Sequence, residues 1–65
     1  MKTKIKKGTP YERVLNLDLL SSYNLEDNTI YFSYTDAYYF AVAYSSKEDA
    51  KEEYDRICRL DDVMQ

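Results

Sequence analysis

The sequence predicts an α+β domain: an antiparallel meander of three strands, or four, followed by one C-terminal helix packed on one sheet face. Apolar residues alternate with polar or small ones between residues 23 and 42, and two turn signals interrupt the alternation. After residue 46 the apolar spacing becomes helical. A chain of 65 residues suits one domain with a small core.

The chain begins with a basic segment that we interpret as a flexible arm, residues 1–8, which precedes a single domain, residues 9–65. The lysines of this arm are Lys2, Lys4, Lys6 and Lys7. No acid lies among them, whereas all twelve acids follow residue 8. Short basic termini are usually solvated, but such an arm can also contact phosphate groups.

Residues 9–20 carry two conflicting signals. Thr9, Pro10 and Glu12 occupy the N-cap, N1 and N3 positions of a helical capping box. Leucines then alternate with polar residues over 15–19, which favours a strand. We expect a short helical turn that passes into an extended segment.

The dipeptide Asp27-Asn28 predicts a two-residue hairpin turn, because both residue types tolerate positive φ angles. The predicted pairs are Glu26 with Thr29, Leu25 with Ile30, Asn24 with Tyr31 and Tyr23 with Phe32. Directly opposed residues share a sheet face. Turn chemistry and hydrophobic pattern therefore agree on this register.

The second connection is predicted to be a three-residue loop, residues 35–37. A two-residue turn would mix apolar and small residues on each face, whereas the longer loop keeps the faces separate. The predicted pairs are Tyr34 with Tyr38, Phe32 with Phe40 and Ile30 with Val42. This register requires a left-handed conformation at Asp36 or Ala37, without the help of glycine.

The C-terminal helix begins after Ser45 or Ser46, since each has an acid three residues further on, and it is expected to end near Leu60. Its apolar stripe is Ala50, Tyr54, Ile57 and Cys58. The expected ion pairs are Glu52 with Arg56 and Asp55 with Arg59. The helix would cover a sheet core made of Tyr23, Leu25, Ile30, Phe32, Tyr34, Tyr38, Phe40 and Val42.

The opposite side of this sheet, which we call the outer face, is nearly uncharged. It comprises Ser22, Asn24, Glu26, Thr29, Tyr31, Ser33, Tyr39, Ala41 and Ala43. Solvated sheet faces usually carry charges that keep them soluble, so this face is expected to be covered. Residues 10–20, a second copy of the chain or a foreign protein are the three covers that we consider. The expected interface, which we call the outer patch, is Tyr31, Ser33, Tyr39, Ala41 and Ala43.

Residue types argue against catalysis. The chain has no histidine, and no paired carboxylates, nucleophile motif or metal-ligand spacing stand out. We therefore expect no cofactor or metal. Cys58 is expected to be a small buried hydrophobe. A single cysteine cannot form an internal disulfide, and no apolar run approaches the ~20 residues of a membrane span, which favours a cytoplasmic protein.

The sequence thus predicts a non-enzymatic protein-interaction module, either a homodimer or a binder of another protein. The alternative is binding of nucleic acid or a nucleotide-like ligand through the lysines of the arm, with Tyr31 and Tyr39 as stacking platforms. The strands themselves supply no lysine or arginine for such a role.

Two loose resemblances bear on these alternatives. The stretch LDLLSSYNLEDNTIYF resembles strand-rich DNA-binding domains of the LytTR type, but it lacks their basic residues, so no binding site is carried over. Small, acidic, tyrosine-rich chains of this kind are similar to phage and mobile-element accessory proteins that bind and inhibit host factors. That second resemblance implies a protein partner.

Overall fold

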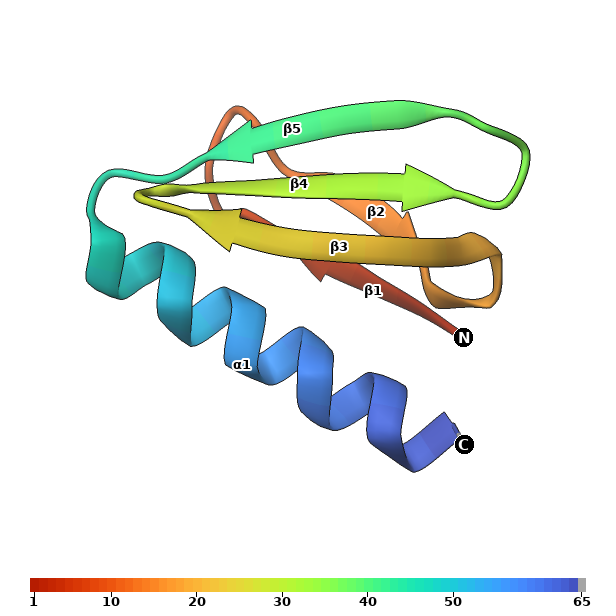
Figure 1. Cartoon of the computed structure of the whole chain (residues 1–65). Helices are drawn as coiled ribbons and strands as arrows, with labels where there is room; N and C mark the ends of the chain where they lie inside the picture. Colours follow the sequence, from red (N-terminus) through yellow and green to blue (C-terminus); the bar gives the residue numbers. More distant parts are fainter. Residues whose placement is uncertain (65) are drawn as a thin grey trace.

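A computed structural model of the chain describes residues 1–64 and confirms the predicted α+β class. The elements are β1 (Lys2–Ile5), β2 (Arg13–Asn16), a 3₁₀ turn η1 (Leu17–Leu19), β3 (Leu20–Glu26), β4 (Thr29–Tyr34), β5 (Tyr39–Ala43) and α1 (Lys47–Met64). Strands β3, β4 and β5 form a three-stranded antiparallel sheet, and β1 pairs with β2 in a separate hairpin. In Figure 1 the hairpin lies behind the larger sheet, and α1 runs beside β3.

The register of the first turn in the larger sheet is as predicted. Leu25 lies opposite Ile30 and Tyr23 lies opposite Phe32. Asp27 adopts the left-handed conformation, with φ of 53°. A residue with positive φ at this position matches the right-handed twist of the flanking strands, which is why the two-residue turn forms here.

The three-residue loop between β4 and β5 is also confirmed. Phe32 lies opposite Phe40, and the backbone N–H of Tyr34 donates to the carbonyl oxygen of Tyr38 at 2.9 Å. Ala37 takes the left-handed conformation with φ of 69°, and its N–H donates to the carbonyl oxygen of Tyr34 at 3.0 Å. Keeping the apolar residues of β4 and β5 together on one face of the sheet thus outweighs the conformational cost of positive φ at an alanine.

The structure corrects the expectation of a flexible arm over residues 1–8. Residues 2–5 form β1, which pairs with β2 so that Ile5 lies opposite Arg13. The Ile5 side chain is fully buried, whereas Lys2 and Lys4 are exposed. The reason is the period-two pattern of this short segment, which sends its lysines outward and its single large apolar side chain into the core.

The capping box at residues 9–12 does not begin a helix, so this prediction was wrong. The segment is a turn, in which the N–H of Glu12 donates to the carbonyl oxygen of Thr9 at 3.2 Å and the Thr9 hydroxyl donates to that of Lys6 at 2.7 Å. The extended part of the prediction is confirmed only for β2, because Leu17–Leu19, where the leucines continue to alternate, form the 3₁₀ turn η1. Burial of Leu15 within the β1–β2 hairpin accounts for the difference, because local capping signals are weaker than tertiary packing.

The core lies on the face of the larger sheet that carries Ile30, Phe32 and Val42. The buried residues are Ile5, Leu15, Leu17, Ile30, Phe32, Val42, Tyr44, Ala50 and Ile57. The predicted core residues Tyr23, Leu25, Tyr34 and Phe40 pack against this cluster while partly buried. Tyr38 was wrongly assigned to the core, because it is 50% exposed at the end of the sheet.

The β1–β2 hairpin and α1 share this core face. The guanidinium of Arg13 lies 4.0 Å from the ring centre of Phe40, and the N–H of Asn16 donates to the Tyr34 hydroxyl at 3.0 Å. Both aromatic residues belong to the core face, so residues 10–20 do not cover the outer face. The first of the three covers considered above is thereby excluded.

Helix α1 begins as predicted, with the Ser46 hydroxyl accepting a hydrogen bond from the N–H of Asp49 at 3.1 Å. It extends beyond the expected end near Leu60, because Asp61 within the apolar stripe accepts a hydrogen bond from the Tyr23 hydroxyl at 3.2 Å. The expected ion pairs are replaced by others. Lys51 pairs with Asp55 at 3.0 Å, and Arg56 pairs with Glu53.

Candidate interaction surface

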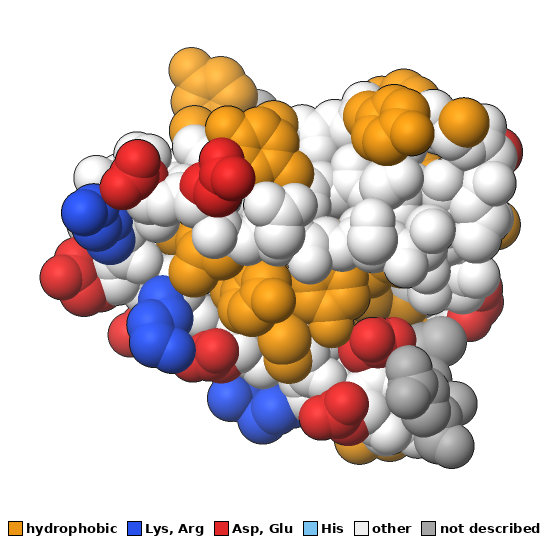
Figure 2. Space-filling view, viewed as in Figure 1, with side chains coloured by type: hydrophobic (Ala, Val, Ile, Leu, Met, Phe, Trp, Pro, Cys, Tyr) orange, Lys and Arg blue, Asp and Glu red, His pale blue; other side chains and the backbone are white. Residues whose placement is uncertain are grey.

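The outer patch is open in the isolated chain. Tyr39 is 73% exposed and Tyr31 is 43% exposed, while Ala41 and Ala43 are exposed and Ser33 is half-buried. In Figure 2 the surface over the middle of β3 and β4 consists of hydrophobic side chains and uncharged polar atoms, while most charged side chains gather along α1. The sheet therefore presents a surface away from its own core that carries one charge, at Glu26.

The residues of the outer patch are neighbours across two strands. Tyr31 lies opposite Ala41 and Ser33 lies opposite Tyr39, so the structure brings together the members that the sequence predicts. The alanines leave low areas beside the tyrosine rings. Tyrosine supplies apolar contact area and a hydroxyl that can find a hydrogen-bond partner, which is why it is enriched at protein interfaces.

A groove adjoins this patch along β5. It is lined by Lys6, Tyr11, Glu12, Arg13, Ala41, Val42 and Ala43. The Lys6 ammonium donates to the carbonyl oxygen of Ala43 at 2.5 Å and lies 5.3 Å from the ring centre of Tyr11. Tyr11 is itself 73% exposed. The turn between β1 and β2, together with Arg13 at the start of β2, thus adds an aromatic and two cationic residues to the surface beside β5.

Sequence reasoning missed this second half of the surface. Lys6 was placed in a flexible arm and Tyr11 fell within the predicted helical turn, whereas both lie on the turn that joins β1 to β2. The alternation of residues 2–5 was the available signal for β1. The position of the turn beside β5 follows only from packing of Ile5 and Leu15 into the shared core.

Of the four lysines proposed for nucleic-acid contact, Lys6 lies beside β5, but the other three are not gathered around Tyr31 and Tyr39. Lys2, Lys4 and Lys7 line a shallow groove with Thr3, Glu53 and Arg56, on the side of the molecule where β1 meets α1. Lys4 also lies 3.7 Å from a carboxylate oxygen of Glu12. The larger sheet separates this groove from Tyr31 and Tyr39, so the two parts of the predicted nucleic-acid site face different ways.

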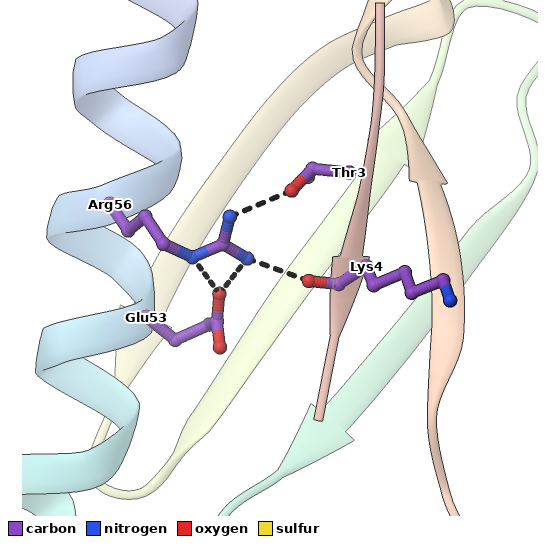
Figure 3. Close-up of polar contacts among 4 residues, drawn as sticks. All are labelled: Thr3, Lys4, Glu53 and Arg56. Carbon is purple, nitrogen blue, oxygen red and sulfur yellow. Dashed lines mark hydrogen bonds and ion pairs between the residues drawn. The ribbon is translucent and has the colours of Figure 1, made fainter. Parts of the chain in front are cut away.

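Arg56 ties α1 to β1 (Figure 3). Its Nη1 donates to the Thr3 hydroxyl at 2.7 Å and its Nη2 donates to the Lys4 carbonyl oxygen at 2.8 Å. Its Nε donates to Oε1 of Glu53 at 2.7 Å, and Nη2 contacts the same oxygen. A planar guanidinium can make these contacts together, whereas an ammonium group cannot.

Two tyrosine hydroxyls are shielded from solvent: that of Tyr23 is partly buried, and that of Tyr44 is buried without a hydrogen-bond partner in the described part of the chain. Burial raises the pKa of Tyr23, and the nearby Cys58 and Asp61 raise it further; its hydroxyl lies 3.6 Å from the Cys58 sulfur. Burial also raises the pKa of Tyr44, as does the Glu53 carboxylate. Both phenols therefore stay protonated at neutral pH and do not supply a base. Cys58 is half-buried on α1.

The described part of the chain, residues 1–64, contains no group of three or more histidine, cysteine or carboxylate residues arranged to hold a metal ion. Its helix is not apolar enough to cross a membrane. The arrangement offers surfaces for contact, with aromatic, small and hydrogen-bonding groups.

Comparison with protein-family models, with curated proteins and with solved structures finds no match to this chain.

Proposed function

We propose that the protein is a non-enzymatic interaction module that binds a second copy of itself or another protein through the outer patch. The observation that carries this proposal is the outer face, on which Glu26 is the single charged residue and which stays open after both the hairpin and α1 have packed on the other side. Exposed charges normally discourage association at such a face, and here β4 and β5 carry none.

Two further observations support a protein partner. Tyr31, Tyr39 and the more distant Tyr11 give the surface the aromatic composition that is typical of protein contacts. A cytoplasmic accessory or inhibitor protein, the class that the composition resembles, would act through such a contact with a host protein.

Placing a charge in the outer patch tests the proposal. We expect Ala41→Lys to abolish association, because a buried ammonium without a partner is costly at an interface. Light scattering after size exclusion would show a fall from twice the chain mass of 7.7 kDa to a single chain, if the partner is a second copy. If the partner is another protein, capture from the native host by the tagged wild type would be lost with this variant.

Val14→Lys is the matched control, because Val14 is an exposed strand residue on the β1–β2 hairpin, outside the outer patch. It should associate as the wild type does. Circular dichroism would verify that both variants are folded. Equal behaviour of the wild type, Ala41→Lys and Val14→Lys in scattering and in capture would contradict the proposal.

A second candidate is anion binding in the shallow groove of Lys2, Lys4, Lys7 and Arg56, which the gathering of these cations favours. It predicts that a fluorescent single-stranded oligonucleotide binds with an affinity that falls steeply as salt rises. Replacing Lys2 and Lys7 by alanine should reduce the slope of this dependence. Binding that is absent at low salt, or unaffected by the double replacement, would exclude this candidate.

A further inference from the structure

We propose that two copies of the chain associate by pairing the free edges of their β5 strands, which joins the two larger sheets into one continuous sheet. This inference rests on the proposed function and deepens it, since it names the partner and the mode of contact. It concerns the backbone edge of β5, whereas the outer patch consists of side chains on the sheet face.

The hydrogen-bond pattern shows which backbone groups of β5 are free. The N–H of Tyr34 donates to the carbonyl oxygen of Tyr38 at 2.9 Å, and the N–H of Tyr44 donates to that of Asn28 at 2.8 Å. Hydrogen-bonded pairs alternate along an antiparallel ladder, so even-numbered residues of β5 direct their N–H and C=O groups at β4. The corresponding groups of Tyr39, Ala41 and Ala43 therefore point away from the sheet.

The residues of β5 themselves carry none of the usual protection against pairing, although Lys6 of the β1–β2 turn lies beside the strand. Proteins commonly block an edge strand with lysine, proline, a bulge or a covering element. The five residues of β5 include no charge and no proline, and its pairing with β4 is regular throughout. The opposite edge differs, because β3 has an irregularity after Leu20 and packs against α1.

One contact does reach the edge of β5, but it leaves the strand able to pair. Lys6 donates to the Ala43 carbonyl oxygen. A carbonyl oxygen has two lone pairs and can accept a second hydrogen bond. A groove borders Ala41, Val42 and Ala43, and Lys6, Tyr11 and Glu12 form its other wall, so a further strand would enter between the β1–β2 turn and β5.

The edge is complementary to itself. If two β5 strands pair in antiparallel fashion about Ala41, Tyr39 comes opposite Ala43 of the partner subunit, and Ala41 comes opposite its own copy. Each of these pairs exchanges two N–H to C=O hydrogen bonds. The large ring of Tyr39, which is exposed in the single chain, would then lie over small side chains. Strand β5 itself brings no charge to the two-fold axis, while Arg13, whose guanidinium lies 4.0 Å from the ring centre of Phe40, flanks the strand on each subunit.

Blocking the central N–H tests this pairing. The N–H of Ala41 points away from β4, so Ala41→Pro removes no hydrogen bond within the chain, and proline is tolerated on edge strands. We expect this variant to raise the dimer dissociation constant at least about tenfold, because each lost bond weakens association. Analytical ultracentrifugation over a concentration series would measure the constant.

A chemically synthesised chain with N-methylalanine at position 41 serves as the second variant if Ala41→Pro fails to fold. In a mixed sample of labelled and unlabelled wild type, an intermolecular nuclear Overhauser effect is expected between the α-protons of Phe40 and Val42 of the partner subunit, since these residues form the close pair of the ladder.

The outcomes separate this inference from the proposed function. A dimer that is lost on blocking the Ala41 N–H supports edge pairing. A dimer that survives this change but is lost with Ala41→Lys overturns edge pairing and leaves contact through the outer patch. A wild type that stays monomeric at millimolar concentration overturns edge pairing, and the capture experiment alone then decides the proposed function.

Discussion

Replacing Ile5 by alanine is expected to lower the free energy of unfolding by about 2–4 kcal/mol. The Ile5 side chain is fully buried and belongs to the same core cluster as Leu15 and Ile30, so its truncation leaves a cavity between the hairpin and the sheet. A loss of this size would consume much of the stability of so small a domain. Urea denaturation followed by circular dichroism would measure it.

Val14→Ala is the matched control, because Val14 lies in the same hairpin but is 52% exposed. This change should alter the free energy of unfolding by no more than about 0.5 kcal/mol. If both variants unfold like the wild type, β1 does not contribute to the core, and the first residues form a free arm as the charge pattern alone indicates.

Replacing Arg56 by alanine is expected to lower the free energy of unfolding by about 1–2 kcal/mol. The change removes the hydrogen bonds to Thr3 and Lys4 and leaves Glu53, whose side chain is only 17% exposed, without its cationic partner. This expected loss of stability is modest because the Arg56 side chain is itself 35% exposed, so water partly screens its ionic contact.

Two further variants identify which property of Arg56 matters. Arg56→Lys keeps the charge but loses the planar fork, so it should recover only a small part of the lost stability. Arg59→Ala, at an exposed position on the same helix, should change stability little. Full recovery by Arg56→Lys would mean that net charge, rather than the bridge to β1, accounts for the effect.

The parts of the fold that could be predicted are those in which neighbouring residues determine the outcome. Asp27-Asn28 sets the first turn of the meander, and the alternation on both sides of it allows only one register. The separation of apolar and small faces likewise selects the three-residue loop that ends at Ala37, although no glycine marks it. The two serines at 45 and 46 locate the start of α1 to within one residue, and the structure shows that Ser46 is the cap.

The first twenty residues could not be predicted because their structure depends on distant contacts. Four lysines conceal the strand alternation that buries Ile5, and the partner strand of β1 lies beyond a turn that resembles a helix cap. The end of α1 was missed for a similar reason. Asp61 is compatible with the apolar stripe only because the Tyr23 hydroxyl donates to it from another element.

The candidate surface likewise has one part that neighbouring residues determine and another part that depends on distant contacts. The positions of Tyr31, Tyr39 and Ala41 on the outer face follow from strand alternation, and the structure places them there. The groove of Lys6, Tyr11 and Arg13 beside β5 could not be anticipated, because it exists only once the hairpin has docked on the core face.

The bridge from Arg56 to Thr3 and Lys4 also has a consequence for synthesis of the protein. Strand β1 leaves the ribosome well before α1, so its hydrogen bonds to Arg56 of the helix cannot form until translation has passed residue 56. Until then β1 is held only by the hairpin and by the packing of Ile5 on the larger sheet, and short two-stranded hairpins are marginal in water. A nascent chain stalled before α1 should therefore be cut by proteases within its first residues, and one stalled far enough beyond α1 for the helix to emerge should resist.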